Sequence, residues 1–267
     1  MRWHGPAAGA AQRWPASFAP LALGLAFALA LLAAGVIAGL AAAAGVDVRA
    51  GAPGVTIAST VAQDSAFVAV AWLLAAQLGP ISARDLGLTR LPLRTAAAWT
   101  IAAIAAWYAF TLLYAALLTP VGKQDTLDAL GANDTVALLV VTTVLVVLVA
   151  PFAEEIFFRG FCYRALRNRF SRWTAAAIVG TIFSAIHYSG PDTLTLLPPL
   201  AVLGALFCLL YERTGSLYPS IALHVVNNAI ALAITAEATQ APITAAIVAI
   251  LTLAACVHLS TTRPAHP

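Results

Sequence analysis

Two adjacent glutamates, Glu154 and Glu155, follow an almost uninterrupted apolar run from Val136 to Phe152. Charged residues make up only 9% of the chain, whereas hydrophobic residues make up 61%. Ionisable groups within such apolar sequence are costly at membrane depth and usually mark a place where chemistry or transport occurs. We therefore begin the search for function at this pair of carboxylates.

The two glutamates are predicted to point in different directions. On a helix, Glu155 and Arg159 are i,i+4 partners on one face, and Cys162 continues that face. Glu154 points about 100° away from this face. We expect Arg159 to neutralise Glu155 and to leave Glu154 available for chemistry.

Two further segments carry imidazole and amide groups. His187 follows Phe183 by one helical turn, so the phenyl ring is expected to pack against the imidazole or to wall a pocket. His224 and Asn228 share one helix face at i,i+4 spacing, whereas Asn227 is expected to bond a neighbouring helix. Taken singly, each of these polar residues is also compatible with a role in helix packing.

Depth counting brings these residues together. Basic residues near the ends of three successive predicted helices mark the inner membrane surface: Arg164, Arg172 and Arg213. At 1.5 Å per residue, the polar residues lie about 15 to 22 Å from that surface. We therefore predict one polar centre near the membrane midplane, built from Glu154, His187, His224 and Asn228.

This set of groups suits hydrolysis of a peptide bond. Glu154 is the expected general base on a water molecule, and His187 is expected to hold that water or to pass a proton to the leaving amine. His224 and Asn228 are expected to donate hydrogen bonds to the oxyanion. Ser184 and Cys162 are conceivable nucleophiles, but neither lies in a recognisable nucleophile motif.

The rest of the chain predicts an all-α, polytopic transmembrane bundle of about eight spans. A mean hydropathy of +0.90 excludes an ordinary soluble domain, and continuous rather than alternating apolar runs disfavour a β-barrel. The predicted spans are Leu21–Gly45, Ala58–Leu78, Thr95–Leu118, Asp134–Phe161, Trp173–Tyr188, Leu194–Tyr211, Leu217–Thr235 and Pro242–Leu259. The fourth is longer than a membrane is thick, and Pro151 offers a kink within it.

Basic residues predict how the bundle is oriented. With the N-terminus inside, 12 of the 14 Lys and Arg residues fall in cytoplasmic segments, and only Arg49 and Lys123 fall outside. We predict a multi-pass protein of the cell membrane with both termini cytoplasmic. The run from Leu21 to Gly45 is long for a signal peptide and is expected to stay as a span. The net charge of +3 reflects this orientation and does not indicate nucleic-acid binding.

Composition along the chain predicts four regions. We expect a cytoplasmic tail over residues 1–20, scaffold helices over 21–133, a catalytic core over 134–235, and a last span with a short tail over 236–267. The scaffold is rich in alanine and carries little chemistry beyond Gln63, Asp64 and Gln77. The three cysteines are scattered and are expected to be free thiols.

Three motifs together resemble one protein family. They are EExxxR at Glu154–Arg159, FxxxH at Phe183–His187 and HxxxN at His224–Asn228. In order and spacing they are similar to those of the CPBP family of CAAX proteases and bacteriocin-processing (Abi) proteins, related to the Ras-converting endopeptidase. The resemblance covers residues 134–235. It implies an intramembrane endopeptidase in which Glu154 and His187 activate water, His224 and Asn228 form an oxyanion hole, and Glu155 and Arg159 support them.

Several alternatives stay open. Glu154, His187 and His224 can also serve as three zinc ligands with Glu155 as the base, although the chain has no HExxH spacing, and the metal-free mechanism is favoured. The expected partners are a peptide or membrane-protein substrate and the lipid bilayer. The competing functions are a proton-coupled transporter, for which no repeated halves are visible, and a non-catalytic membrane scaffold.

Overall fold

The computed structural model describes residues 14–48, 52–118 and 126–261, and within these ranges every regular element is helical. The prediction of an all-α bundle is confirmed. Most of the two tails lies outside the described residues. So do five of the basic residues from which the orientation was predicted: Arg2, Arg13, Arg49, Lys123 and Arg263.

Seven helices in the described residues are long and apolar enough to cross a membrane. Six of them are α1 (Phe18–Ala43), α2 (Pro53–Ala76), α3 (Leu93–Leu118), α9 (Leu197–Thr214, preceded by the 3-10 turn η4, Pro191–Leu196), α10 (Tyr218–Thr235) and α11 (Ala241–Thr261). The predicted span Trp173–Tyr188 is α8 (Arg172–Ala185), whose 14 residues fall short of that length. It ends early because the chain tightens into turns at His187 and Tyr188.

The seventh is one long helix, residues 136–167, whose 32 residues confirm the predicted excess length. It would measure about 48 Å as a regular helix, against about 30 Å of bilayer hydrocarbon. The helix changes register twice, in two π-helical segments on either side of Pro151. Its parts are α5 (Val136–Val144), η2 (Leu145–Val149), α6 (Ala150–Glu154), η3 (Glu155–Tyr163) and α7 (Arg164–Arg167).

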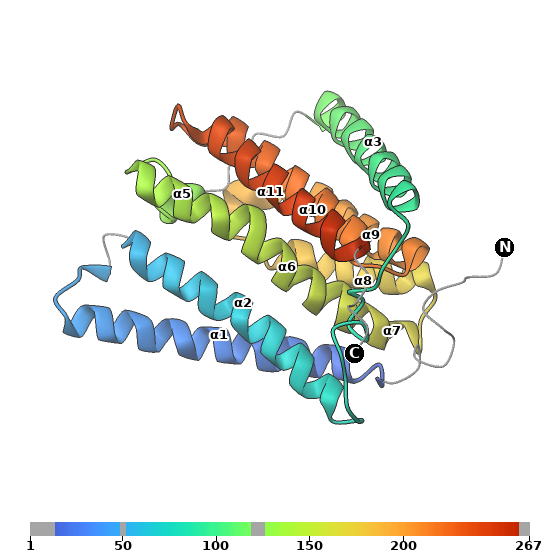
Figure 1. The fold of residues 1–267 in the computed structure, drawn as a ribbon. Helices are drawn as coiled ribbons and strands as arrows, with labels where there is room; N and C mark the ends of the chain where they lie inside the picture. Colours follow the sequence, from blue (N-terminus) through green and yellow to red (C-terminus); the bar gives the residue numbers. More distant parts are fainter. Residues whose placement is uncertain (1–13, 49–51, 119–125, 262–267) are drawn as a thin grey trace.

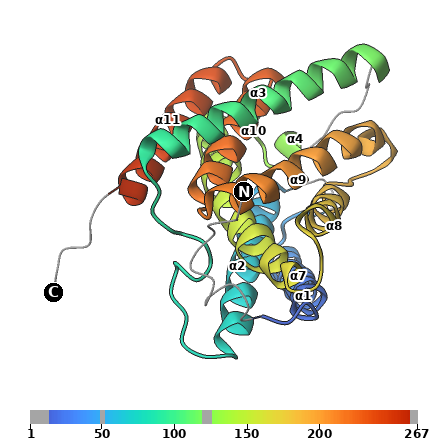
Figure 2. The same cartoon turned by 90° about the vertical axis from the view of Figure 1, so that its right-hand side faces the viewer.

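The long helix lies in the middle of the bundle (Figure 1). The α1–α2 pair covers one side of it, and α10 and α11 lie on the other side. The α8–α9 pair packs beside η3, and α3 lies on the outside, across α9 and α10 (Figure 2). The short helix α4 (Thr126–Ala129) precedes the long helix in the chain. The central position of the long helix gives its polar residues neighbours on several other helices.

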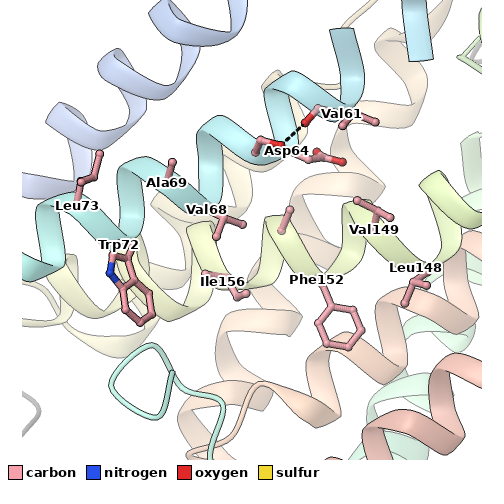
Figure 3. Close-up of a pocket in the computed structure, with 12 residues that line it drawn as sticks. Val61, Asp64, Val68, Ala69, Trp72, Leu73, Leu148, Val149, Phe152 and Ile156 are labelled. Carbon is pink, nitrogen blue, oxygen red and sulfur yellow. Dashed lines mark hydrogen bonds between the residues drawn. The ribbon is translucent and has the colours of Figure 1, made fainter. Parts of the chain in front are cut away.

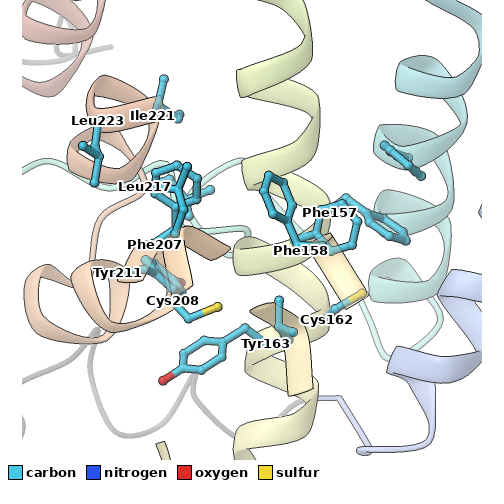
Figure 4. Close-up of a cluster of buried hydrophobic side chains, with 14 of the residues drawn as sticks. Phe157, Phe158, Cys162, Tyr163, Phe207, Cys208, Tyr211, Leu217, Ile221 and Leu223 are labelled. Carbon is cyan, nitrogen blue, oxygen red and sulfur yellow. The ribbon is translucent and has the colours of Figure 1, made fainter. Parts of the chain in front are cut away.

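Buried aromatic side chains surround η3 (Figure 4). Phe157, Phe158 and Phe161 on η3 are all buried. Phe67 of α2 stacks on Phe157 with 4.6 Å between ring centroids. The three cysteines are free and buried, as expected. This apolar packing excludes solvent from η3, the segment that begins with Glu155.

Two glycines allow α8 and α9 to approach closely. A methyl group on Gly180 would collide with the backbone carbonyl of Ala201 and would lie 2.7 Å from the amide nitrogen of Ala205. A methyl group on Gly204 would lie 2.9 Å from the Cα atom of Gly180. Small residues at such crossings let helix backbones meet in a membrane. The crossing also fixes the position of the Gly204 carbonyl, which belongs to the site described below.

Gly180→Ala is expected to lower stability because the added methyl group meets backbone atoms that cannot turn away. The expected loss is about 1–3 kcal/mol, measured by thermal unfolding of the purified protein in detergent. Gly35→Ala is the matched control, since nothing lies within 4 Å of a methyl group there. Equal unfolding temperatures for the two variants would contradict the close crossing.

Candidate active site

A fully buried ion pair connects Glu155 and Arg159 of the EExxxR motif. Arg159 Nη1 donates to Glu155 Oε1 at 2.9 Å, and both side chains are 0% exposed. The predicted pairing of Glu155 with Arg159 is confirmed. Because both charges have left water, the pair is stable only if its remaining polar atoms find partners nearby.

Arg159 also binds a second helix. Its Nη2 donates to the carbonyl oxygen of Gly204 on α9 at 3.0 Å. The guanidinium carbon lies 4.5 Å from the ring centroid of Phe183 and 4.7 Å from that of Phe207. Desolvated cation–π contacts of this kind add to the ion pair. Arg159 therefore ties the long helix to α8 and α9.

His224 on α10 lies against both glutamates. Its Nδ1 is 3.1 Å from Glu155 Oε1, and its Nε2 is 3.7 Å from Glu154 Oε2. The shorter contact is a hydrogen bond, in which Nδ1 donates because an ionised carboxylate only accepts. The longer contact exceeds hydrogen-bond distance. Glu154 Oε2 is buried and has no hydrogen-bond partner, so its acceptor capacity is unused.

Asn228 is held by a carbonyl that the π-helical segment releases. In η2 the amide of Ala150 donates to Leu145 rather than to Val146, and Pro151 has no N–H to offer instead. The carbonyl oxygen of Val146 accepts a hydrogen bond from Asn228 Nδ2 at 3.0 Å. One N–H of the Asn228 amide is thereby used, and the second is not used by this bond.

His187 is oriented in the same way by an irregular helix end. Its backbone amide donates to Ser184, which leaves the carbonyl of Phe183 without that donor. The ring Nδ1 lies 2.7 Å from the Phe183 carbonyl oxygen. A carbonyl only accepts, so Nδ1 carries the proton and Nε2 of the neutral ring is an acceptor.

Phe183 links the two histidines. Its ring centroid lies 4.7 Å from that of His187, as the FxxxH spacing predicts, and 5.8 Å from that of His224. The predicted site residues thus converge from three segments of the bundle. Glu154, Glu155, Arg159 and His224 are in direct contact, and His187 joins them across the Phe183 ring.

Asp64 on α2 was assigned by sequence to the scaffold, yet it lies close to the site. Its side chain is 3% exposed, and its Oδ2 has no hydrogen-bond partner. It lines a groove of about 770 Å³ between α2 and the long helix. In Figure 3, Asp64 and Trp72 on α2 face Phe152 and Ile156 across this groove. A lone acid in an apolar span is the signal that identifies it.

The described residues include no group of three or more His, Cys, Asp and Glu side chains that could hold a metal ion. The zinc alternative requires Glu154, His187 and His224 to form such a group. The contacts of His224 instead place it in an ion-pair and hydrogen-bond network with the two glutamates.

The fold and site define an integral membrane protein of many apolar helices with a buried acid–imidazole–amide centre. Residues 136–230 match the family model of the type II CAAX prenyl endopeptidase Rce1-like domain. The resemblance to CAAX proteases that the three motifs predict is confirmed over this segment, which contains all of the predicted site residues.

A relative in Escherichia coli, described only as an uncharacterized 24.3 kDa protein, is 28% identical over 137 residues. The match covers 50% of this chain and 62% of the relative. No solved structure matches the chain.

Arg159→Met is expected to destabilise the protein by about 3–5 kcal/mol, because it leaves Glu155 buried without its cation. Thermal unfolding in detergent measures the loss. Arg172→Met is the control, because Arg172 is exposed at the start of α8. The double variant Glu155→Met/Arg159→Met removes both charges and is expected to recover much of the stability. An Arg159→Met protein as stable as Arg172→Met would contradict the role of the pair.

Proposed function

We propose that this protein is a CAAX-protease-like intramembrane endopeptidase that hydrolyses a peptide bond with water activated by Glu154 and His187. One observation carries the proposal: Glu154 Oε2 is buried without a hydrogen-bond partner, 3.7 Å from His224 Nε2. Glu155 Oε2 also lacks a partner, but Glu155 is committed through Oε1 to Arg159 and His224. A general base needs a free oxygen that can reach a water molecule, and catalytic contacts are often loose before substrate binds. The Rce1-like match over residues 136–230 supports the same reaction class.

In the proposed mechanism Glu154 takes a proton from water, and the resulting hydroxide attacks the scissile carbonyl carbon. The tetrahedral intermediate then collapses with cleavage of the C–N bond, and the amine leaves with the proton that Glu154 took from water. His187 has Nε2 available to orient the water or to carry a proton toward the amine. Glu155 holds Arg159 and His224 in place through its Oε1.

Two groups are suited to the oxyanion. The second N–H of the Asn228 amide is not used by its bond to Val146. His224 already donates from Nδ1 to Glu155. A second proton on Nε2 would make the imidazole ring a cation whose Nε2–H can donate a hydrogen bond to the oxyanion. Both groups lie in an apolar environment, where a hydrogen-bond donor stabilises an oxyanion more strongly than it does in water.

The expected substrate is a peptide with an apolar part that lies in the membrane. The groove between α2 and the long helix is lined mainly by apolar side chains and includes Ala153, the neighbour of Glu154. An apolar chain or helix in this groove would lie next to the proposed base.

Glu154→Gln is expected to lower kcat by about 10²–10⁴-fold, because glutamine cannot accept the proton from water. The assay is cleavage of a fluorogenic peptide whose farnesylated cysteine is followed by three residues, in detergent micelles. Glu237→Gln, an exposed acid outside the site, is the control.

Membrane peptides from cells with the wild-type or the Glu154→Gln protein are compared in parallel, and uncut substrates are expected to accumulate in the variant. Cleavage of such a peptide, but not of the farnesylated one, would indicate a different substrate. Equal peptide inventories together with an inert wild-type enzyme would contradict the protease, and full rescue of a deletion phenotype by Glu154→Gln would favour a scaffold.

Activity is expected to survive removal of metal ions, because Glu154 activates the water without one in this mechanism. The purified wild-type protein is analysed for bound metal, dialysed against EDTA and assayed again. Less than a twofold change is expected. Stoichiometric zinc whose removal abolishes activity, and whose return restores it, would establish the zinc alternative.

A further inference from the structure

Asn228 stands in a chain of three hydrogen bonds that begins on the peripheral helix α3. Trp107 Nε1 donates to Asn227 Oδ1 at 3.0 Å, and Asn227 Nδ2 donates to Asn228 Oδ1 at 3.2 Å. Asn228 Nδ2 then donates to the carbonyl oxygen of Val146 at 3.0 Å. The prediction that Asn227 bonds a neighbouring helix is confirmed, and the partner is Trp107.

The two ends of this chain determine its direction. An indole N–H can only donate, and a backbone carbonyl can only accept. The amide of Asn227 must therefore present its oxygen to Trp107 and its nitrogen to Asn228. The amide of Asn228 must in turn present its oxygen to Asn227 and its nitrogen to Val146, which places both of its N–H groups on the side away from Asn227.

Trp107 is set apart from the rest of α3, most of which is exposed on the outside of the bundle. Only two of its residues, Ala103 and Trp107, are buried, and the Trp107 side chain is 5% exposed. One helical face carries a stack of aromatic rings, in which Trp107 lies 6.0 Å from Phe110 and Phe110 lies 6.1 Å from Tyr114. Tyr114 donates to the carbonyl of Thr195 in η4 at 2.8 Å. The stack presents the Trp107 indole to α10 in a defined orientation.

We propose that Trp107 is a positioning residue of the proposed active site: acting through Asn227, its indole N–H sets the amide orientation in which Asn228 can donate to the oxyanion. This inference rests on the proposed function. Without the indole donor, Asn227 is free to rotate its amide, and Asn228 then loses the partner that holds its oxygen away from the substrate. The loss of the indole donor is therefore expected to weaken stabilisation of the transition state and not the binding of substrate.

The test uses the full-length protein and the farnesylated fluorogenic peptide, or the membrane peptide that accumulates in Glu154→Gln cells. Trp107→Phe removes the donor and keeps an aromatic ring in the stack. Trp99→Phe is the matched control on the same helix, because Trp99 contacts Arg213 and is not one of the residues in the three hydrogen bonds from Trp107 to Val146. Asn227→Asp is a second variant that keeps the acceptor for Trp107 and removes the donor to Asn228.

Trp107→Phe and Asn227→Asp are each expected to lower kcat by about 10- to 100-fold, a loss typical of a misplaced catalytic group. KM and the unfolding temperature are expected to stay close to those of Trp99→Phe. The decisive comparison is with Asn228→Ala. Once the Asn228 amide is gone its orientation no longer matters, so Trp107→Phe/Asn228→Ala is expected to match Asn228→Ala alone.

Full activity of Trp107→Phe and Asn227→Asp, beside inactive Glu154→Gln and Asn228→Ala, would overturn this inference and leave the proposed function standing. The inference would also be overturned if the losses in kcat of Trp107→Phe and Asn228→Ala multiply in the double variant, because the two residues would then act independently. Full activity of Glu154→Gln and Asn228→Ala would overturn the proposed function and this inference with it. If Trp107→Phe fails to fold, Asn227→Asp alone decides between these outcomes.

Discussion

The buried ion pair between Glu155 and Arg159 is the interaction on which the rest of the site depends. Two charges inside an apolar bundle are costly unless each is paired and hydrogen-bonded. Arg159 donates to the Gly204 carbonyl and contacts the rings of Phe183 and Phe207, while its Nε has no hydrogen-bond partner. Glu155 Oε1 also accepts from His224, while its Oε2 has no hydrogen-bond partner. The pair therefore holds α8, α9 and α10 around the long helix, and one buried oxygen of each glutamate, Glu154 Oε2 and Glu155 Oε2, has no hydrogen-bond partner.

Irregular helix geometry orients the other polar side chains. The π-helical segment before Pro151 frees the carbonyl of Val146, which Asn228 binds. The tightened end of α8 frees the carbonyl of Phe183, which the ring of His187 binds. A carbonyl without its helical donor must find another donor in an apolar environment. Each irregularity thus specifies which atom of a site side chain is committed and which atom is left for chemistry.

Much of this arrangement is predictable from sequence because it depends on local spacing. The i,i+4 rule correctly pairs Glu155 with Arg159 and places Phe183 against His187. Contacts between distant segments are a different matter. The first three helices look like an inert scaffold, yet they contribute Asp64, which lines the groove together with Ala153, and Trp107, which donates to Asn227. Neither residue belongs to a motif, so only the packing of α2 and α3 against the core reveals its neighbours.

The sequence by itself determined an all-helical membrane bundle, the buried polar residues of the long helix and the pairing of Glu155 with Arg159. Those properties follow from hydropathy and from the 3.6-residue period of a helix, which act over a few turns. Only the tertiary structure decided that His224 contacts both carboxylates, that a groove opens between α2 and the long helix, and that Trp107 reaches the amide pair on α10. These depend on how helices approach one another, which small residues such as Gly180 and Gly204 permit without specifying the partner.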